Sequence, residues 1–148
     1  MTDTEAKNGL LSHETKGYDS YNINYHYISK GNELIFKYSL GQIPSCCGTA
    51  LLSNATIVMS RNSVTQDIKD FIFCRIYKYC IDAGLRNIIF TDILEGNINY
   101  ILKDKFNLLH SYRNVNTNNI VEIREYTIDP EEFDYPDDYD ENGADYDD

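Results

Sequence analysis

The sequence predicts a domain of the α/β (α+β) class, with a mixed, mostly antiparallel sheet, a crossover helix and a second, shorter helix. Three observations lead to this prediction. Residues 21–39 alternate like a pair of strands, residues 66–83 carry apolar side chains at helical spacing, and an apolar strand centred on residues 88–90 follows. Parallel strands joined by a helix require a right-handed crossover, and the closing strands add antiparallel pairs.

The first two strands form a predicted hairpin. Aromatic and aliphatic residues alternate with asparagine and histidine over residues 21–27, the period of a half-buried strand, which places Tyr25 and Tyr27 on the apolar face. Lys30-Gly31-Asn32 is typical of a turn, and residues 34–38 form the returning strand.

Two short apolar runs follow a connector that contains Pro44. They cover residues 49–52 and 55–59, on either side of Ser53-Asn54. They form either a tight hairpin or one bent strand, and we favour the hairpin.

The clearest element is a helix over residues 66–83. Its apolar spacing of three and four residues defines one continuous face. That face consists of Ile68, Phe71, Ile72, Arg75, Ile76 and Tyr79. Thr65 is placed to cap the N-terminus, Asp67 faces the positive end of the helix dipole, and Gly84 suits a left-handed C-terminal cap.

The remaining elements alternate between strand and helix. Residues 85–91 form a predicted strand, and its continuous apolar middle indicates a central strand covered on both faces. A second helix is predicted over residues 95–105. Its inward side chains would be Ile98, Ile101 and Leu102. The last strands, residues 106–113 and 120–128, are joined by an asparagine-rich turn over residues 114–119.

Two polar residues in this half are candidates for a special role. His110 alternates with Leu108 and Tyr112, so we expect a hydrogen-bonded core histidine rather than a ligand. Asp92 ends the central strand, where open α/β sheets bind ligands, but it suits a cap of the following turn equally well.

The negative charge is concentrated at the C-terminus. The 148-residue chain has a net charge of −11, and eleven Asp or Glu residues lie in residues 129–148, which hold no Lys or Arg. Residues 1–128 are therefore close to neutral, which argues against direct nucleic-acid binding. We predict a flexible N-terminal arm (residues 1–17), one domain (residues 18–128) and a disordered acidic tail (residues 129–148).

The four cysteines indicate a reducing compartment. The N-terminus is polar, without the apolar core of a signal peptide, and no segment approaches a membrane span. We therefore expect a cytoplasmic protein with reduced thiols and no membrane association. Cys46-Cys47 lacks the spacer that zinc ligands prefer, and Cys74 and Cys80 fall on different helix faces, so we expect structural cysteines and no metal site.

From about residue 55 to residue 128, the order of elements resembles the GNAT acetyltransferase fold. The resemblance is carried by the helix end Ala83-Gly84-Leu85, by Asn87-Ile88-Ile89-Phe90-Thr91 and by Leu102-Lys103-Asp104-Lys105-Phe106. The chain also resembles small bacteriophage proteins of unassigned role. The matching residues are Cys46-Cys47-Gly48 and Asn114, Asn116, Thr117 and Asn119. This second resemblance implies a viral protein, located in the host cytoplasm or the virion.

The GNAT resemblance implies a coenzyme A pyrophosphate loop. The residues concerned are Met59, Ser60, Arg61, Asn62 and Ser63. The family's loop is Arg/Gln-x-x-Gly-x-Gly/Ala, and its glycines let backbone N–H groups approach the pyrophosphate at a helix N-terminus. Here Arg61 matches, but Val64 and Gln66 occupy the glycine positions. The family's general-acid tyrosine corresponds to Ile101, and the neighbouring Tyr100 lies about 100° around the helix.

Two functions remain open from the sequence. We favour a GNAT-like domain of a phage protein that has lost catalysis and binds a host or virion protein with a basic surface. The candidate contacts in the tail are Phe133, Tyr135, Tyr139 and Tyr146. The alternative is an active N-acyltransferase with acetyl-CoA as its cofactor. Exposed sheet edges also make the protein a candidate homodimer.

Overall fold

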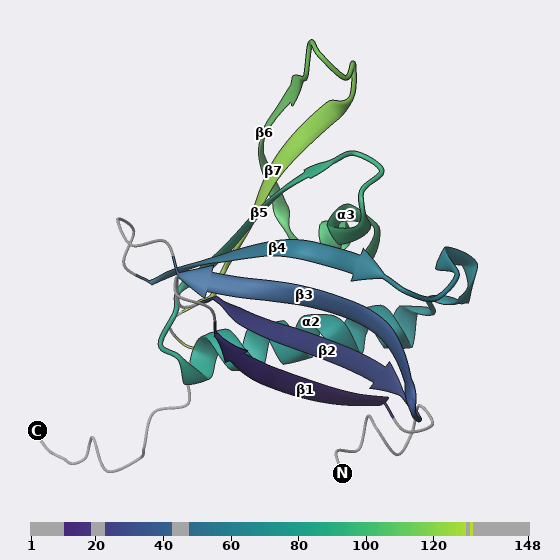
Figure 1. The fold of residues 1–148 in the computed structure, drawn as a ribbon. Helices are drawn as coiled ribbons and strands as arrows, with labels where there is room; N and C mark the ends of the chain where they lie inside the picture. The colour runs from purple at the N-terminus through teal and green to yellow at the C-terminus, as the bar shows by residue number, and fades with distance from the viewer. Residues whose placement is uncertain (1–10, 19–22, 43–47, 130, 132–148) are drawn as a thin grey trace, which may run out of the picture.

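The computed structural model describes residues 11–18, 23–42, 48–129 and 131, which form a seven-stranded sheet with helices (Figure 1). The strand order is β1-β2-β3-β4-β5-β7-β6, and only β4 and β5 pair in parallel. The strands are β1 (Leu11–Tyr18), β2 (Asn24–Lys30), β3 (Glu33–Gln42), β4 (Thr49–Ile57), β5 (Asn87–Ile93), β6 (Asn107–Arg113) and β7 (Ile120–Thr127). The predicted mixed, mostly antiparallel sheet is confirmed.

Helix α2 (Gln66–Asp82) is the predicted crossover helix, and its caps form as expected. The Thr65 hydroxyl accepts a hydrogen bond from the Ile68 N–H at 3.2 Å. At the other end, Gly84 has φ 75°, and the N–H of Leu85 donates to the carbonyl of Cys80 at 2.8 Å, which closes a Schellman motif. Local sequence therefore fixes both ends of this helix.

The helices cover one face of the sheet. In Figure 1, α2 runs behind β1–β3, and the short helix α3 (Asn97–Leu102) packs against α2. The shared core contains side chains from both helices and from the inner face of the sheet. Its most buried members include Ile28, Leu40, Leu52, Ile72, Ile76, Ile88, Phe90 and Leu102. Ile98, Ile101 and Leu102 point inward, as the sequence predicted.

The N-terminal segment differs from the prediction. We expected residues 1–17 to form a flexible arm, but Leu11–Tyr18 is strand β1, paired with β2 along its length. The side chain of Leu11 is completely buried. The helix-covered face of β1 carries Leu11, His13 and Thr15, of which only Leu11 is apolar, so the segment shows no alternation of apolar and polar residues.

The hairpin of β2 and β3 is confirmed, with Gly31 at φ 63° in its turn, but the faces of β2 are reversed. Asn24, His26 and Ile28 are buried, whereas Tyr25 and Tyr27 are half-buried on the face without helices. The reason is tertiary packing of His26 against β3 and α2. The His26 ring stacks on Tyr38 and meets Tyr79 of α2 edge-on, both at 4.8 Å between centroids.

The predicted hairpin over residues 49–59 is wrong, and the alternative of one bent strand is correct. Residues on both sides of Asn54 pair with β3, and two residues, Asn54 and Ala55, face the single residue Tyr38. This is a β-bulge, with Asn54 in the left-handed region at φ 55°. The Asn54 amide donates to the Ser39 hydroxyl at 3.0 Å, which ties the bulge to β3.

Strands β5 and β6 also depart from expectation. Ile88 and Phe90 are fully buried, but Ile89 is only half-buried, so β5 is covered on one face and not on both. All seven residues of the edge strand β6 are exposed, and the expected core histidine, His110, is therefore a surface residue. The asparagine-rich turn is confirmed. Its Asn114 side chain accepts from two backbone N–H groups, and Asn118 has φ 62°.

Candidate functional site

The site begins where the sheet opens between its two parallel strands. β4 and β5 pair only from Thr49 and Asn87 to Leu51 and Ile89, and beyond that point the strands separate (Figure 1). A cavity of about 440 Å³ lies in this splay. Its wall includes Ser53, Ala55, Arg61, Thr91, Asp92 and Asn97. The backbone of β4 beyond Leu51 thus has no β5 partner and faces this cavity.

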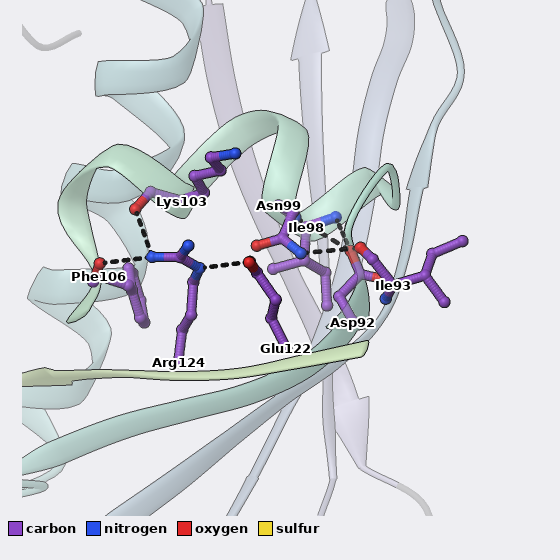
Figure 2. Close-up of polar contacts among 8 residues, drawn as sticks. All are labelled: Asp92, Ile93, Ile98, Asn99, Lys103, Phe106, Glu122 and Arg124. Atoms are coloured by element: carbon purple, nitrogen blue, oxygen red, sulfur yellow. Dashed lines mark hydrogen bonds and ion pairs between the residues drawn. The ribbon is translucent and has the colours of Figure 1, made fainter. Parts of the chain in front are cut away.

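Asp92 of β5 caps α3 at the edge of the cavity. Its carboxylate accepts hydrogen bonds from the N–H groups of Ile98 and Asn99, at 2.9 and 3.0 Å, as Figure 2 shows. A carboxylate is favourable there because the N-terminus of a helix carries partial positive charge. Of the two alternatives that the sequence left open for Asp92, the structure therefore supports the cap.

The other end of α3 is held by an ion pair from β7. Arg124 Nε lies 2.8 Å from Glu122 Oε1, and both side chains are largely buried. Arg124 Nη1 donates to the carbonyl of Phe106 at 3.2 Å and lies 3.5 Å from that of Lys103, just after the helix (Figure 2). A carboxylate at one end and a guanidinium at the other both complement the helix dipole, so α3 is fixed although it is only six residues long.

Asn97, the first residue of α3, bridges the mouth of the splay. Its Nδ2 donates to the carbonyl of Ala55 on β4 at 3.0 Å, and its Oδ1 accepts from Arg61 Nη2 at 2.9 Å. The arginine that resemblance assigned to a pyrophosphate therefore bonds within the protein. Both functional groups of the Asn97 amide are occupied across the opening.

Tyr100 completes this arrangement from the next turn of α3. Its hydroxyl donates to the carbonyl of Arg61 at 2.8 Å. Its ring lies 4.8 Å from the Arg61 guanidinium carbon and 4.6 Å from Lys69 Nζ, which are cation–π distances. A second cavity, of about 320 Å³, adjoins the ring and is also bordered by Arg61 and Lys103. Ile101, at the general-acid position, is buried in the core.

The expected phosphate loop, Met59 to Ser63, lies between β4 and α2. Arg61–Ser63 form a single 3₁₀ turn, and Val64 is buried with φ −82°. No residue from Met59 to Gln66 has a positive φ. At the N-terminus of α2, the Thr65 hydroxyl accepts the hydrogen bond of the Ile68 N–H, and Asp67 supplies a negative charge to the first turn. The Ile68 N–H at this end of α2 is therefore already paired within the protein.

The sequence identified Arg61 and missed its partners. Asn97, Lys69 and Lys103 had no local signal, because they come together only when α2 and α3 pack beside the splay. Tyr100 was noticed only as a neighbour of the general-acid position.

Other candidate residues are not part of this site. Cys46-Cys47 and the tail residues Phe133, Tyr135, Tyr139 and Tyr146 lie outside the described residues. Cys80 is buried and Cys74 is exposed, on different faces of α2 as predicted. Burial raises the pKa of the Cys80 thiol to about 12. In the part of the chain that the structure describes, no three His, Cys, Asp or Glu side chains converge as a metal-binding group, and no helix has the length and hydropathy of a membrane span.

Solved structures similar to this chain include acetyltransferases. An N-acetyltransferase from Staphylococcus aureus Mu50 is 13% identical, with a TM-score of 0.60, over 80% of this chain and 97% of the other. An acetyltransferase from Bacillus subtilis in complex with CoA is 10% identical, with a TM-score of 0.61, over 80% and 99%. IAA acetyltransferase from Bacillus cereus ATCC 14579 is 8% identical, with a TM-score of 0.62, over the same shares.

No family model matches the sequence, and no curated protein matches it. At these identities, the structural similarity establishes the fold and not the activity. This chain is thus a domain with the GNAT acetyltransferase fold.

Proposed function

We propose that this protein uses the GNAT fold as a binding domain and has lost acetyl transfer. The observation that carries the proposal is the bridge from Ala55 through Asn97 to Arg61, which closes the mouth of the splay with two hydrogen bonds. A ligand that paired with the β4 backbone at Ala55 would have to displace the Asn97 amide from the Ala55 carbonyl.

The residues at the catalytic positions support the loss of transfer. A general acid must reach the leaving group, and Ile101 can donate no proton and is buried. The hydroxyl of the adjacent Tyr100 donates to the carbonyl of Arg61. Ile101 is a buried hydrocarbon, and the Tyr100 hydroxyl already donates to the Arg61 carbonyl. This side of the cavity therefore has no proton source of the family's kind.

Activity and binding of the cofactor test this proposal directly. We expect no release of coenzyme A thiol from acetyl-CoA with polyamine, aminoglycoside or peptide amine acceptors. We also expect no rise in melting temperature with millimolar coenzyme A. Asn97→Ala removes the bridge, and Asn116→Ala, at an exposed asparagine of the turn between β6 and β7, is the matched control. Turnover by the wild-type chain would refute the proposal.

The partner that we propose is a protein with a basic surface, in the host cytoplasm or the virion. This part of the proposal depends on the charge of residues 129–148, because the folded part of the chain is close to neutral. Removing residues 132–148 should abolish capture of the partner and leave the melting temperature unchanged. Replacing the four tail aromatics with serine at constant charge would separate aromatic contacts from electrostatics. Undiminished capture of the partner by the truncated chain would exclude a role of the tail in binding.

A coenzyme A-dependent N-acyltransferase is the second candidate, and one observation favours it. Arg61 and Lys69 lie over the ring of Tyr100, and Arg61 and Lys103 border the cavity beside the splay, together with Glu95 and Asp104. The basic side chains would hold phosphate groups, and the backbone N–H groups near Met59 to Arg61 would polarise a carbonyl. Acetyl-CoA would supply an activated acyl group, and an amine would attack it directly, with proximity providing most of the acceleration. Saturable coenzyme A binding that Lys103→Glu weakens would favour this candidate.

A homodimer through the exposed edge strand is a further proposal about assembly. β6 has no outer neighbour among the described strands, and Leu108, Leu109 and Tyr112 on it are 44–53% exposed. Sedimentation equilibrium should detect a dimer that Leu109→Lys disrupts. A monomer at all concentrations would exclude the dimer.

A further inference from the structure

We propose that His13 and His26 form an acid-sensitive clasp, which holds strand β1 on the sheet at neutral pH and releases it on acidification. His13 lies on β1 and His26 on β2. Neither residue belongs to the site between β4 and β5, so the inference is independent of the proposed function.

The clasp acts on an edge strand of the helix-covered part of the sheet. β1 is an edge strand that pairs only with β2, and its residues Glu14 to Gly17 are exposed. On the helix-covered face, β1 presents Leu11, which is fully buried, His13, and Thr15, whose hydroxyl contacts His26. A change at His13 therefore alters one of the side chains through which β1 contacts the helix-covered face.

The two imidazoles are in direct contact. His13 Nε2 lies 2.9 Å from His26 Nδ1, and the ring centroids are 5.1 Å apart at 21°. The Thr15 hydroxyl lies 3.3 Å from the same His26 nitrogen. One of the two facing nitrogens must carry hydrogen and the other must accept it, so the contact requires that at least one ring is neutral.

The surroundings of the pair favour the uncharged state. Described titratable or charged groups that face it are Tyr38 from β3, and Arg75, Tyr79 and Cys80 from α2. Glu14 and Lys16 pair with Tyr27 and Tyr25, on the opposite face of the sheet. His26 is fully buried, and its Nε2 and the Tyr38 hydroxyl have no hydrogen-bond partner in the described part of the chain. A proton added here meets a guanidinium and neutral groups.

Protonation weakens the contact in two steps. The first proton places a positive charge in a desolvated site beside Arg75, while one N–H can still donate across the pair. The second proton turns both facing nitrogens into donors, so the hydrogen bond is lost and two cations stand at contact distance. Moving β1 away returns His13 to water, where its charge is solvated.

The pKa values follow from this environment. Burial, then the Arg75 charge, lowers the pKa of His13 from 6.5 to about 4, and burial, then His13, lowers that of His26 to about 4. Because the folded pKa lies below the released one, the released state binds more protons at intermediate pH. The stabilisation of β1 is therefore complete above pH 6.5 and is lost as the pH falls towards 4.

Amide hydrogen exchange at pH 7 and pH 5, expressed as protection factors, tests the clasp. The opening constant of the β1 amides should rise by roughly twentyfold for one histidine with these two pKa values. His110→Gln, which changes the exposed histidine of β6, should behave like the wild type, whereas His13→Gln should remove most of the rise. An equal rise in His13→Gln would overturn the proposal.

Side-chain NMR titration of the wild-type protein provides a readout that does not depend on any variant folding. Both clasp histidines should titrate well below the ordinary histidine pKa of 6.5. Titration of His13 near its ordinary pKa of 6.5, with β1 amides still protected at pH 5, would equally overturn the proposal.

Discussion

Gly96 lies directly against the carboxylate of Asp92, at a distance that leaves no room for a Cβ atom. The glycine is the residue before α3, and the carboxylate caps that helix. The bridge across the splay begins at the next residue, Asn97. The absence of a side chain at position 96 is therefore a condition for the arrangement of the whole site.

Substituting Gly96 with alanine should destabilise the fold. The added methyl group would push the carboxylate away from the N–H groups of Ile98 and Asn99, which combines overpacking with a lost cap. We expect a decrease of about 2–3 kcal/mol in the free energy of unfolding, measured by urea denaturation. Gly17→Ala is the control, because a Cβ at position 17 meets nothing within 4 Å. Equal stability of the two variants would contradict the prediction.

Removing one member of the pair Glu122 and Arg124 should be costly, and the arginine should matter more. Arg124→Met leaves a buried carboxylate without its cation and also removes the donor to the Phe106 carbonyl. We expect a loss of roughly 3 kcal/mol, and a smaller one for Glu122→Gln, which keeps a hydrogen-bond acceptor. Chemical denaturation measures the change in the free energy of unfolding for both variants. Substitutions in the exposed pair of Lys78 and Asp82 serve as the control. A smaller loss for Arg124→Met than for Glu122→Gln would show that the carbonyl contacts contribute little.

The hydroxyl of Thr65 should stabilise α2 as its N-terminal cap. Thr65→Ala removes the acceptor for the Ile68 N–H and should lower the melting temperature, at a cost of about 1 kcal/mol. Ser63→Ala removes a nearby exposed hydroxyl that caps no helix and should have little effect. Circular dichroism melting curves compare the two. The prediction fails if the serine variant is the less stable one.

The two cysteines of α2 should differ strongly in reactivity. Cys74 is exposed, whereas Cys80 is fully buried and its pKa is raised to about 12, so its thiolate is scarce at neutral pH. Iodoacetamide at pH 8 should modify Cys74 within minutes and leave Cys80 intact until the protein is unfolded. Peptide mapping by mass spectrometry measures this. Modification of both at similar rates would mean that α2 opens locally on that timescale.

The sequence by itself determined the elements whose signals are local. Thr65, the apolar spacing from Ile68 onward and Gly84 specify α2, because caps and helical periodicity act within a few residues of each other. Lys30-Gly31-Asn32 specifies its turn for the same reason, since glycine tolerates a positive φ. These elements, in their order, were enough to indicate the fold.

Only the tertiary structure decided which faces are buried and what the site contains. β2 buries His26 instead of its tyrosines because α2 lies on that side, and residues 11–18 become a strand because β2 offers an open edge. The bridge between Ala55, Asn97 and Arg61 joins residues up to 42 positions apart. Such contacts leave no periodic trace in the sequence, since each depends on where a different element has packed.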